Sequence, residues 1–191
     1  MRKVIWSLVV TLGFITTSAW AADTYQIDPL HSTLGFSIRH MMLSNVTGQF
    51  DKYEGQIIYD PNDLANSKVK VTIQAESIDT RNDKRDGHLR SGDFFDTAKF
   101  PTITFVSKKI TSGEMVGDLT MKGVTKEVSI PVTISGPVKT MGTNTAIGIS
   151  GSFTLNRQDY GINYNKTLDQ GGLAVGNEVA VDINVEADKQ K

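Results

Sequence analysis

The sequence of 191 residues contains no cysteine. Disulfide bonds, which hold together many small secreted domains, are therefore excluded. The folded chain has to be stabilised by the burial of apolar side chains, and its length is sufficient for one domain with a sizeable core.

Sequence signatures of enzymes are missing as well. The chain has no Gly-x-Ser-x-Gly nucleophile elbow, no P-loop, no paired-carboxylate arrangement and no familiar metal-ligand spacing. Ser32 stands beside His31 and near Asp28, but adjacent residues on a strand point to opposite faces, so the three do not read as a nucleophile with its base. The sequence therefore favours a protein that is not an enzyme.

The sequence also lacks an apolar run of the ~20 residues that a transmembrane helix needs. Its most apolar stretch, Val4–Ile15, spans about a dozen residues. Arg2 and Lys3 precede this stretch and a small-x-small pattern at residues 19–21 follows it, as is typical of a secretory signal peptide. We expect residues 1–21 to be removed on export and the remaining chain to carry no transmembrane anchor.

An excess of basic residues is absent too. Arg2 and Lys3 are the charged residues before position 22, so the remaining chain carries 20 − 2 = 18 basic and 21 acidic residues, a net charge of −3. This balance argues against a nucleic-acid-binding surface. Residues 22–191 are thus predicted to form one soluble domain outside the cytoplasm.

Alternation of apolar and polar residues dominates the chain that follows. In the clearest case Val69, Val71 and Ile73 alternate with polar residues, which is typical of a strand with one buried face. The same period recurs over residues 32–39, 55–59, 102–110, 119–121, 128–134, 147–155 and 179–185. About eight such strands joined by short turns predict an all-β protein with an antiparallel sheet, either a sandwich or a closed barrel.

A polar segment interrupts this alternation between Asp79 and Asp96. We expect one or two short helical turns here, with Ser91 capping the second. Because the segment joins two strands near the middle of the chain, it is suited to cover an open barrel end, and this favours the barrel. A barrel of about eight strands can be filled by its own side chains or can hold one small ligand.

Turn residues predict further local features. Lys122-Gly123 indicates a hairpin, and Pro131 indicates an edge or bulge position within its strand. Gly136-Pro137 and Met141-Gly142 are expected to bound a loop. Residues 158–176 are rich in glycine and asparagine and predict a long loop with a short strand inside it.

A series of short motifs runs in a fixed order through the chain from Tyr25 to Glu186. The motifs are Ile27-Asp28 with His31-Ser32, Phe36 and His40; Gly48, Phe50 and Gly55; Ser77-Ile78-Asp79-Thr80; Arg85-Asp86 with His88-Leu89-Arg90; Asp93-Phe94-Phe95; Phe100-Pro101 with Thr104-Phe105; Gly117-Asp118-Leu119-Thr120; Gly123-Val124-Thr125-Lys126; and Asn156-Arg157 with Tyr160-Gly161. In these motifs, whose order over most of the chain is specific, the sequence resembles the YceI-like family of bacterial periplasmic lipid-binding proteins.

The resemblance implies an eight-stranded antiparallel lipocalin-like β-barrel with a short helical lid segment, formed by residues 22–191. It also implies a periplasmic binding or carrier protein for a polyisoprenoid or similar long-chain lipid, held in an apolar tunnel. No cofactor is expected other than such a lipid, for example a polyprenyl chain or an isoprenoid quinone. The resemblance leaves open which lipid is bound and whether the protein forms a homodimer.

The apolar faces of the predicted strands supply a lining for such a tunnel, because a hydrocarbon chain needs a long dry slot and few directed hydrogen bonds. The candidate lining residues are Leu34, Phe36, Ile38, Phe50, Val71, Ile73, Phe94, Phe95, Ile103, Phe105, Leu119 and Met121. Alternatively, the same side chains fill a solid core, and the protein is a structural or stress-related interaction module.

The predicted lid contains a dense cluster of polar residues, formed by Arg85, Asp86, His88, Arg90 and Asp93. One interpretation is that the arginines and His88 contact a lipid head group such as a quinone oxygen or a pyrophosphate. Another is that His88 binds a metal with Asp86 and Asp93, as part of a small hydrolase or metal-dependent enzyme. The third is an internal network that orders the lid.

Overall fold

The structure is a computed structural model that describes residues 22–141, 144–169 and 171–191. The predicted signal peptide, residues 1–21, lies outside these residues. Across the described part of the chain, no helix combines the length and the apolar character needed to cross a membrane.

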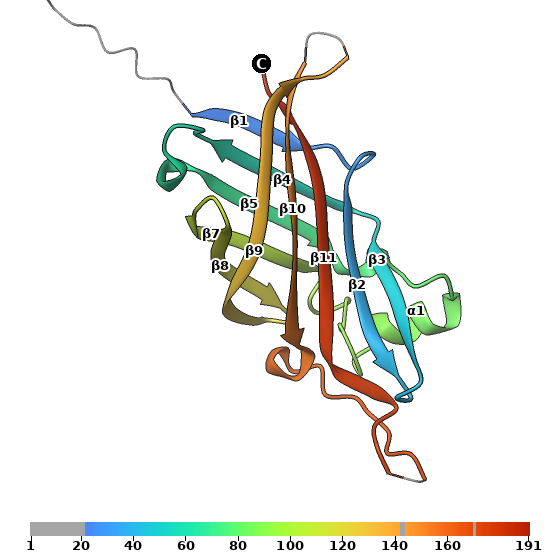
Figure 1. The fold of residues 1–191 in the computed structure, drawn as a ribbon. Coiled ribbons are helices and arrows are strands. Elements are labelled where there is room, and N and C mark those ends of the chain that lie inside the picture. Colours follow the sequence, from blue (N-terminus) through green and yellow to red (C-terminus); the bar gives the residue numbers. More distant parts are fainter. Residues whose placement is uncertain (1–21, 142–143, 170) are drawn as a thin grey trace, which may run out of the picture.

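Eight antiparallel strands close into a barrel (Figure 1), which confirms the fold class predicted from the sequence. Around the barrel the strands follow the order β1 (Asp23–Ile27), β4 (Tyr53–Tyr59), β5 (Lys68–Gln74), β7 (Thr102–Ile110), β8 (Glu114–Met121), β9 (Val124–Lys139), β10 (Thr145–Asn156) and β11 (Val175–Lys189). Strand β11 pairs back with β1 and completes the ring.

Three further strands extend the sheet from β11: β2 (Thr33–His40), β3 (Ser44–Phe50) and the short β6 (Ile78–Asp79). Strand β11 is long enough to pair with β1 near its C-terminal end and with β2 over its preceding residues. The sequence analysis did not predict β1 or β3 as strands. Each offers only a short signal: in β1 the alternating apolar residues are Tyr25 and Ile27, and in β3 Gly48 separates Val46 from Phe50.

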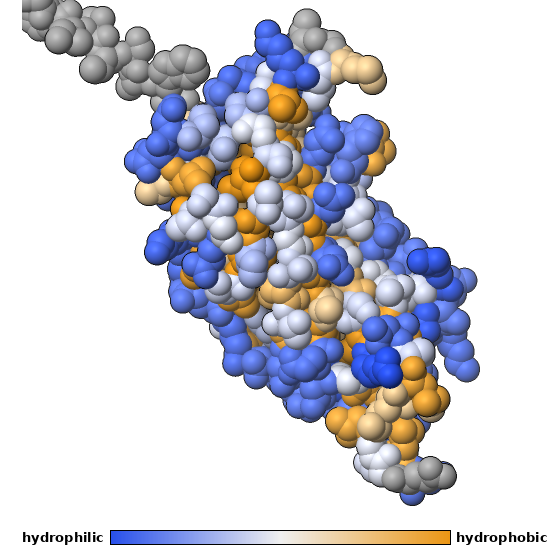
Figure 2. Space-filling model, in the orientation of Figure 1, coloured by the Kyte–Doolittle hydropathy of each residue, from blue (hydrophilic) through white to orange (hydrophobic). Residues whose placement is uncertain are grey.

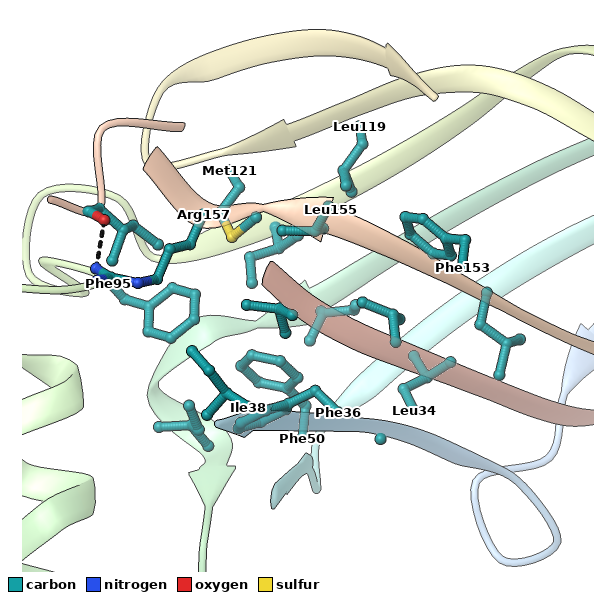
Figure 3. A pocket seen from close by; sticks show the side chains of 18 of the residues that line it. Leu34, Phe36, Ile38, Phe50, Phe95, Leu119, Met121, Phe153, Leu155 and Arg157 are labelled. Atoms are coloured by element: carbon teal, nitrogen blue, oxygen red, sulfur yellow. Dashed lines mark hydrogen bonds between the residues drawn. The ribbon is translucent and has the colours of Figure 1, made fainter. Parts of the chain in front are cut away.

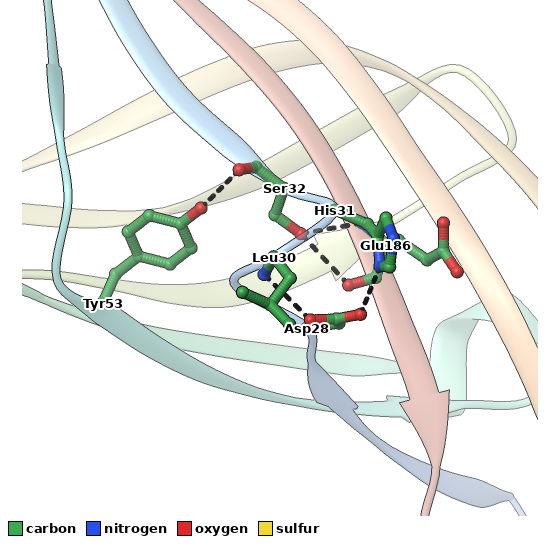
Figure 4. Close-up of polar contacts among 6 residues, drawn as sticks. All are labelled: Asp28, Leu30, His31, Ser32, Tyr53 and Glu186. Atoms are coloured by element: carbon green, nitrogen blue, oxygen red, sulfur yellow. Dashed lines mark hydrogen bonds and ion pairs between the residues drawn. The ribbon is translucent and has the colours of Figure 1, made fainter.

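Ser32 fills the gap in the ladder where β11 changes partner from β1 to β2 (Figure 4). Its hydroxyl donates to the carbonyl oxygen of Glu186 (3.2 Å) and accepts from the Glu186 N–H (3.0 Å). The hydroxyl of Tyr53 donates to the Ser32 carbonyl oxygen (2.7 Å). Ser32 therefore has a structural role at the seam of the barrel.

His31 and Asp28 form an exposed pair in the turn before β2 (Figure 4). The imidazole Nδ1 of His31 donates to Asp28 Oδ2 (2.6 Å). This hydrogen bond raises the pKa of His31 and lowers the pKa of Asp28. The pair belongs to the turn, and the Ser32 hydroxyl is directed to the backbone of Glu186 instead.

The segment between β6 and β7 contains one α-helix, α1 (Asp83–Arg90). Asn82 caps its N-terminus by accepting a hydrogen bond from the Arg85 N–H (3.0 Å). The expectation that Ser91 caps a second helical turn is wrong, because Ser91 ends α1 and its hydroxyl donates to the His88 carbonyl oxygen (2.8 Å). The remaining helical segments are the 3-10 turns η1 (Leu64–Asn66), η2 (Ala75–Ser77) and η3 (Arg157–Tyr160).

The predicted turns have different outcomes. Lys122 and Gly123 connect β8 to β9 with positive φ at both residues, which confirms the hairpin. Pro131 is the last residue of β9 that pairs with β8, and pairing with β10 begins at the next residue, Val132. The missing N–H of Pro131 therefore costs no hydrogen bond to β10. The segment 158–176 is largely a loop, with η3 and one isolated bridge.

The loop expected between Gly136-Pro137 and Met141-Gly142 begins later than predicted, because β9 runs on to Lys139. Gly142 lies outside the described residues. Ser135 pairs with Gly148 and Val138 with Ala146, so two residues of β9 oppose one residue of β10. A β-bulge of this kind removes the local ladder bond and thereby accommodates a proline within a strand.

The buried side chains form two clusters. The larger cluster includes Tyr25, Ile57 and Ile147 and closes the barrel end where β1 and the C-terminal end of β11 lie (Figure 1). The second cluster includes Phe94, which follows α1, and Tyr160 of η3. The barrel is thus densely packed at one end and covered by irregular segments at the other.

Replacing Ser32 with alanine tests its role at the barrel seam. The substitution removes both hydrogen bonds to Glu186 and should lower the free energy of unfolding by about 1–2 kcal/mol. Urea titration measures this change, with Ser150→Ala on the exposed side of β10 as the control. Equal unfolding midpoints for the two variants would contradict the assigned role.

Candidate functional site

The barrel encloses a cavity of about 450 Å³ (Figure 3), within the ~300–1,000 Å³ range of ligand pockets. The structure places all twelve predicted lining residues on its wall: Leu34, Phe36, Ile38, Phe50, Val71, Ile73, Phe94, Phe95, Ile103, Phe105, Leu119 and Met121. The interior is therefore hollow, in agreement with the tunnel interpretation and not with a solid core. That these residues contact a ligand stays a prediction.

Several of these side chains face the interior and are nevertheless only half-buried, among them Leu34, Phe36 and Phe50. At the closed end, by contrast, Tyr25 and Ile147 do not line the cavity, and each is 1% exposed. The difference arises because the cavity leaves the wall without packing partners. A hydrocarbon ligand that covers this apolar surface removes it from water, which lowers the free energy of the folded protein.

Strands β10 and β11 supply lining residues that the sequence analysis did not nominate. They include Ile149, Phe153, Leu155, Val179, Val181 and Ile183. Their alternation was recognised as that of one-faced strands, so the signal was available. Phe153 and Leu155 face Phe36, Ile38 and Phe50 across the same space in Figure 3.

The charged residues that line the cavity are all basic. They are Arg39, Arg85, Arg157 and Lys166, and His40 and His88 line it as well. No carboxylate belongs to the wall among the residues that the structure describes. These basic residues come from the end of β2, from α1 and from the segment around η3, which together surround the end opposite the packed cluster.

Of the five predicted lid residues, Arg85 and His88 line the cavity, whereas Asp86, Arg90 and Asp93 do not. Asp86 is 4% exposed and accepts hydrogen bonds from the Thr80 N–H (3.0 Å) and the Thr80 hydroxyl. Arg85 donates to the Thr80 hydroxyl and to the Thr80 carbonyl oxygen, both at 2.7 Å. Arg85 and Asp86 thus hold α1 against the chain that follows β6.

Arg90 and His88 anchor the other side of α1. Arg90 donates to the carbonyl oxygens of Glu76 (2.7 Å) and Ile78 (2.9 Å). His88 donates from Nε2 to Asp93 Oδ2 (2.8 Å), and its ring lies edge-on to Phe94 and Tyr164, with centroids 5.0 and 4.8 Å away. These contacts match the internal-network interpretation of the cluster.

The geometry does not bring His88, Asp86 and Asp93 together. His88 contacts Asp93, whereas Asp86 is turned toward Thr80. Across residues 22–141, 144–169 and 171–191, no group of three or more His, Cys, Asp or Glu side chains is arranged to hold a metal. The metal interpretation of this cluster finds no support in the arrangement.

Arg157 is a cavity residue that the sequence analysis did not select, although it belongs to the Asn156-Arg157 motif (Figure 3). It is 3% exposed and donates to the carbonyl oxygens of Ile162 (2.6 Å) and Gly176 (2.8 Å). Burial lowers the pKa of its guanidinium. Arg157 ties the loop after η3 to the start of β11.

A second hollow of about 710 Å³ lies outside the barrel and is wide open to solvent. Polar and small residues such as Ser150, Ser152 and Asp182 line it. Although its volume is larger, much of it is bulk solvent, so the enclosed apolar cavity is the better candidate site.

Comparison with known proteins agrees with this architecture. A family model described as YceI-like domain matches residues 25–187. A UPF0312 protein of Staphylococcus aureus (strain MRSA252) is 43% identical over 163 residues, which cover 85% of this chain and 95% of that protein.

Solved structures show the same fold. A Campylobacter jejuni YceI protein has a TM-score of 0.67 and 33% identity, covering 80% of this chain and 90% of that one. Burkholderia cenocepacia BcnA has a TM-score of 0.72 at 23% identity, covering 84% and 98% of the two chains. A polyisoprenoid-binding domain from Saccharophagus degradans has a TM-score of 0.65 at 18% identity, covering 87% and 98%. The family match and the relatives together show that this chain belongs to the YceI-like family.

Proposed function

We propose that the protein binds a long-chain lipid of the polyisoprenoid type inside the barrel and carries it in the periplasm. The observation that supports this most directly is the apolar cavity of about 450 Å³, with its incompletely packed wall. The proposal describes a binding protein, not an enzyme.

The chemistry of the wall suits a hydrocarbon chain. Each buried methylene-sized group contributes about 0.8 kcal/mol, so two or three isoprene units supply several kcal/mol before the ordering of the ligand is subtracted. A polyisoprenoid needs few directed hydrogen bonds, and the strand residues of the wall offer almost none. The basic residues at the open end are suited to lie next to a polar head group of the lipid.

The polyisoprenoid class is the first to test because the Saccharophagus degradans neighbour, which shares the fold, is described as a polyisoprenoid-binding domain. The periplasmic location rests on the charged start, the apolar stretch and the small-x-small pattern of residues 1–21.

Organic extraction of the purified, untagged protein followed by mass spectrometry tests the proposal. We expect a co-purified long-chain lipid, or, after delipidation, saturable uptake of an added polyprenol. Failure to find a bound or exchangeable lipid across several chain types would contradict the lipid-binding function.

A charge placed in the wall should prevent loading. Phe105→Asp puts a carboxylate into the cavity, where desolvation disfavours it, so we expect at least about a tenfold loss of lipid uptake. The neighbouring Val106 is exposed on the outer face of β7, so Val106→Asp is a matched control that should load normally. Thermal unfolding must confirm that both variants are folded, and normal uptake by a folded Phe105→Asp variant would speak against the cavity as the site.

His88→Ala separates binding from the hydrolase or metal-dependent enzyme considered for this region. The variant loses the hydrogen bond to Asp93 and the contact with Tyr164 but leaves the strand residues of the wall in place. We expect lipid uptake within about threefold of the unmodified protein, since the chain is bound by apolar burial. A turnover activity that is abolished in this variant would instead favour an enzyme.

A further inference from the structure

Large apolar side chains are exposed at the turn between β2 and β3. Met41, Met42 and Leu43 are 43%, 61% and 80% exposed, and Leu173, in the loop before β11, is 40% exposed. We call these four residues the apolar tip. Figure 2 shows apolar residues gathered at this lower end of the molecule, where Figure 1 places the β2–β3 turn and the loop before β11.

The two parts of the apolar tip are in direct contact. The Met41 N–H donates to the carbonyl oxygen of Ala174 (2.8 Å). The side chain of Met42 lies so close to Gly172 that a Cβ on that glycine would be 2.5 Å from the Met42 sulfur. The hairpin turn and the loop therefore present one continuous surface.

The backbone of the turn gives no reason for methionine at these positions. Met41 and Met42 have φ angles of 48° and 61°, in the left-handed region that favours glycine or asparagine. Methionine is a strained choice there, and neither side chain is buried in return. An apolar surface retained at the expense of turn stability points to an external contact.

The apolar tip borders the open end of the cavity. Ile38 and His40 lie in the last three residues of β2, just before Met41, and Ala174 and Val175 follow Leu173. All four line the cavity. The opposite end is closed by packed side chains that include Tyr25 and Ile147, neither of which lines the cavity. A ligand that enters the barrel from this side passes the apolar tip.

Charge next to the apolar tip favours an anionic surface. Arg39 donates to the carbonyl oxygen of Met42 (2.9 Å), and Lys166 lies in the neighbouring loop. Within the described residues, neither side chain takes part in an ion pair. Asp169 lies in the same loop as Lys166, so Arg39, Lys166 and Asp169 together contribute a net charge of 2 − 1 = +1, whereas residues 22–191 as a whole have a net charge of 18 − 21 = −3.

We propose that the apolar tip inserts into the surface of a phospholipid bilayer and thereby places the open end of the cavity against the lipid phase. The inference rests on the proposed function, because a carrier has to collect a water-insoluble ligand from a membrane. Exposed Met and Leu side chains with flanking basic residues are the chemistry that binds the interface of an anionic bilayer.

Flotation with vesicles of phosphatidylethanolamine and phosphatidylglycerol tests the inference. In the double variant Met41→Asn with Met42→Gly, the new residues suit the left-handed backbone, so the fold should be as stable as before. We expect the vesicle-bound fraction to fall by at least about tenfold, because two apolar side chains are lost from the interface. Leu30→Ser and Val138→Ser remove exposed apolar side chains outside the apolar tip and should bind vesicles normally.

Lipid loading from detergent, without vesicles, is measured on the same variants and tests the proposed function separately. Reduced vesicle binding with unchanged loading from detergent supports the inference. Equal vesicle binding by the double variant and the controls would overturn it, whatever the loading. The inference would also be overturned if the unmodified protein did not bind vesicles and instead formed a dimer in analytical ultracentrifugation that the double variant did not form. The apolar tip would then be assigned to self-association.

Discussion

The pairing of β11 with two different strands is the constraint on which the rest of the structure depends. Near its C-terminal end β11 pairs with β1, which closes the ring of eight strands, and over its preceding residues it pairs with β2. At the β1 end the inward side chains meet and form the packed cluster. At the other end β2, β3 and α1 take part in the wall, and the interior is wide enough to leave a cavity. The hydroxyl of Ser32 supplies the hydrogen bonds to Glu186 of β11, between the part of β11 that pairs with β1 and the part that pairs with β2.

A hollow interior means that a molecule bound inside the barrel would add to its stability. The wall residues have fewer packing partners than a filled core would give them. A molecule that binds only the folded state raises the free energy of unfolding by RT ln(1 + L/Kd), where L is its free concentration. The lid is held independently of any ligand, because Arg85, Asp86 and Arg90 bond to Thr80, Glu76 and Ile78 of the chain itself. The hydrogen bonds within the chain thus fix the position of α1 at the open end of the cavity.

The polar residues of the lid show how far residue type alone can lead. The sequence indicated Arg85, Asp86, His88, Arg90 and Asp93 as one cluster. In the structure all five help to hold α1 and the turn after it, and of these five Arg85 and His88 also line the cavity. The reason is geometric: on a helix of eight residues, neighbouring side chains point in different directions. Arg157, Tyr164 and Lys166 reach the same cavity from a distant loop, and no local pattern relates them to α1.

The sequence by itself determined the one-faced strands and the inward residues, because alternation with period two is a local property that survives in any sheet. It therefore predicted twelve of the residues that line the cavity, and the turn residues predicted the hairpin at Lys122-Gly123. Only the tertiary structure decided that the strands close on themselves and that β9 continues through Pro137 by a bulge. It also decided that Met41 and Met42 contact Ala174 and Gly172 at the open end. These features depend on contacts between segments far apart in the chain, and such contacts leave no periodic signal in the residues that make them.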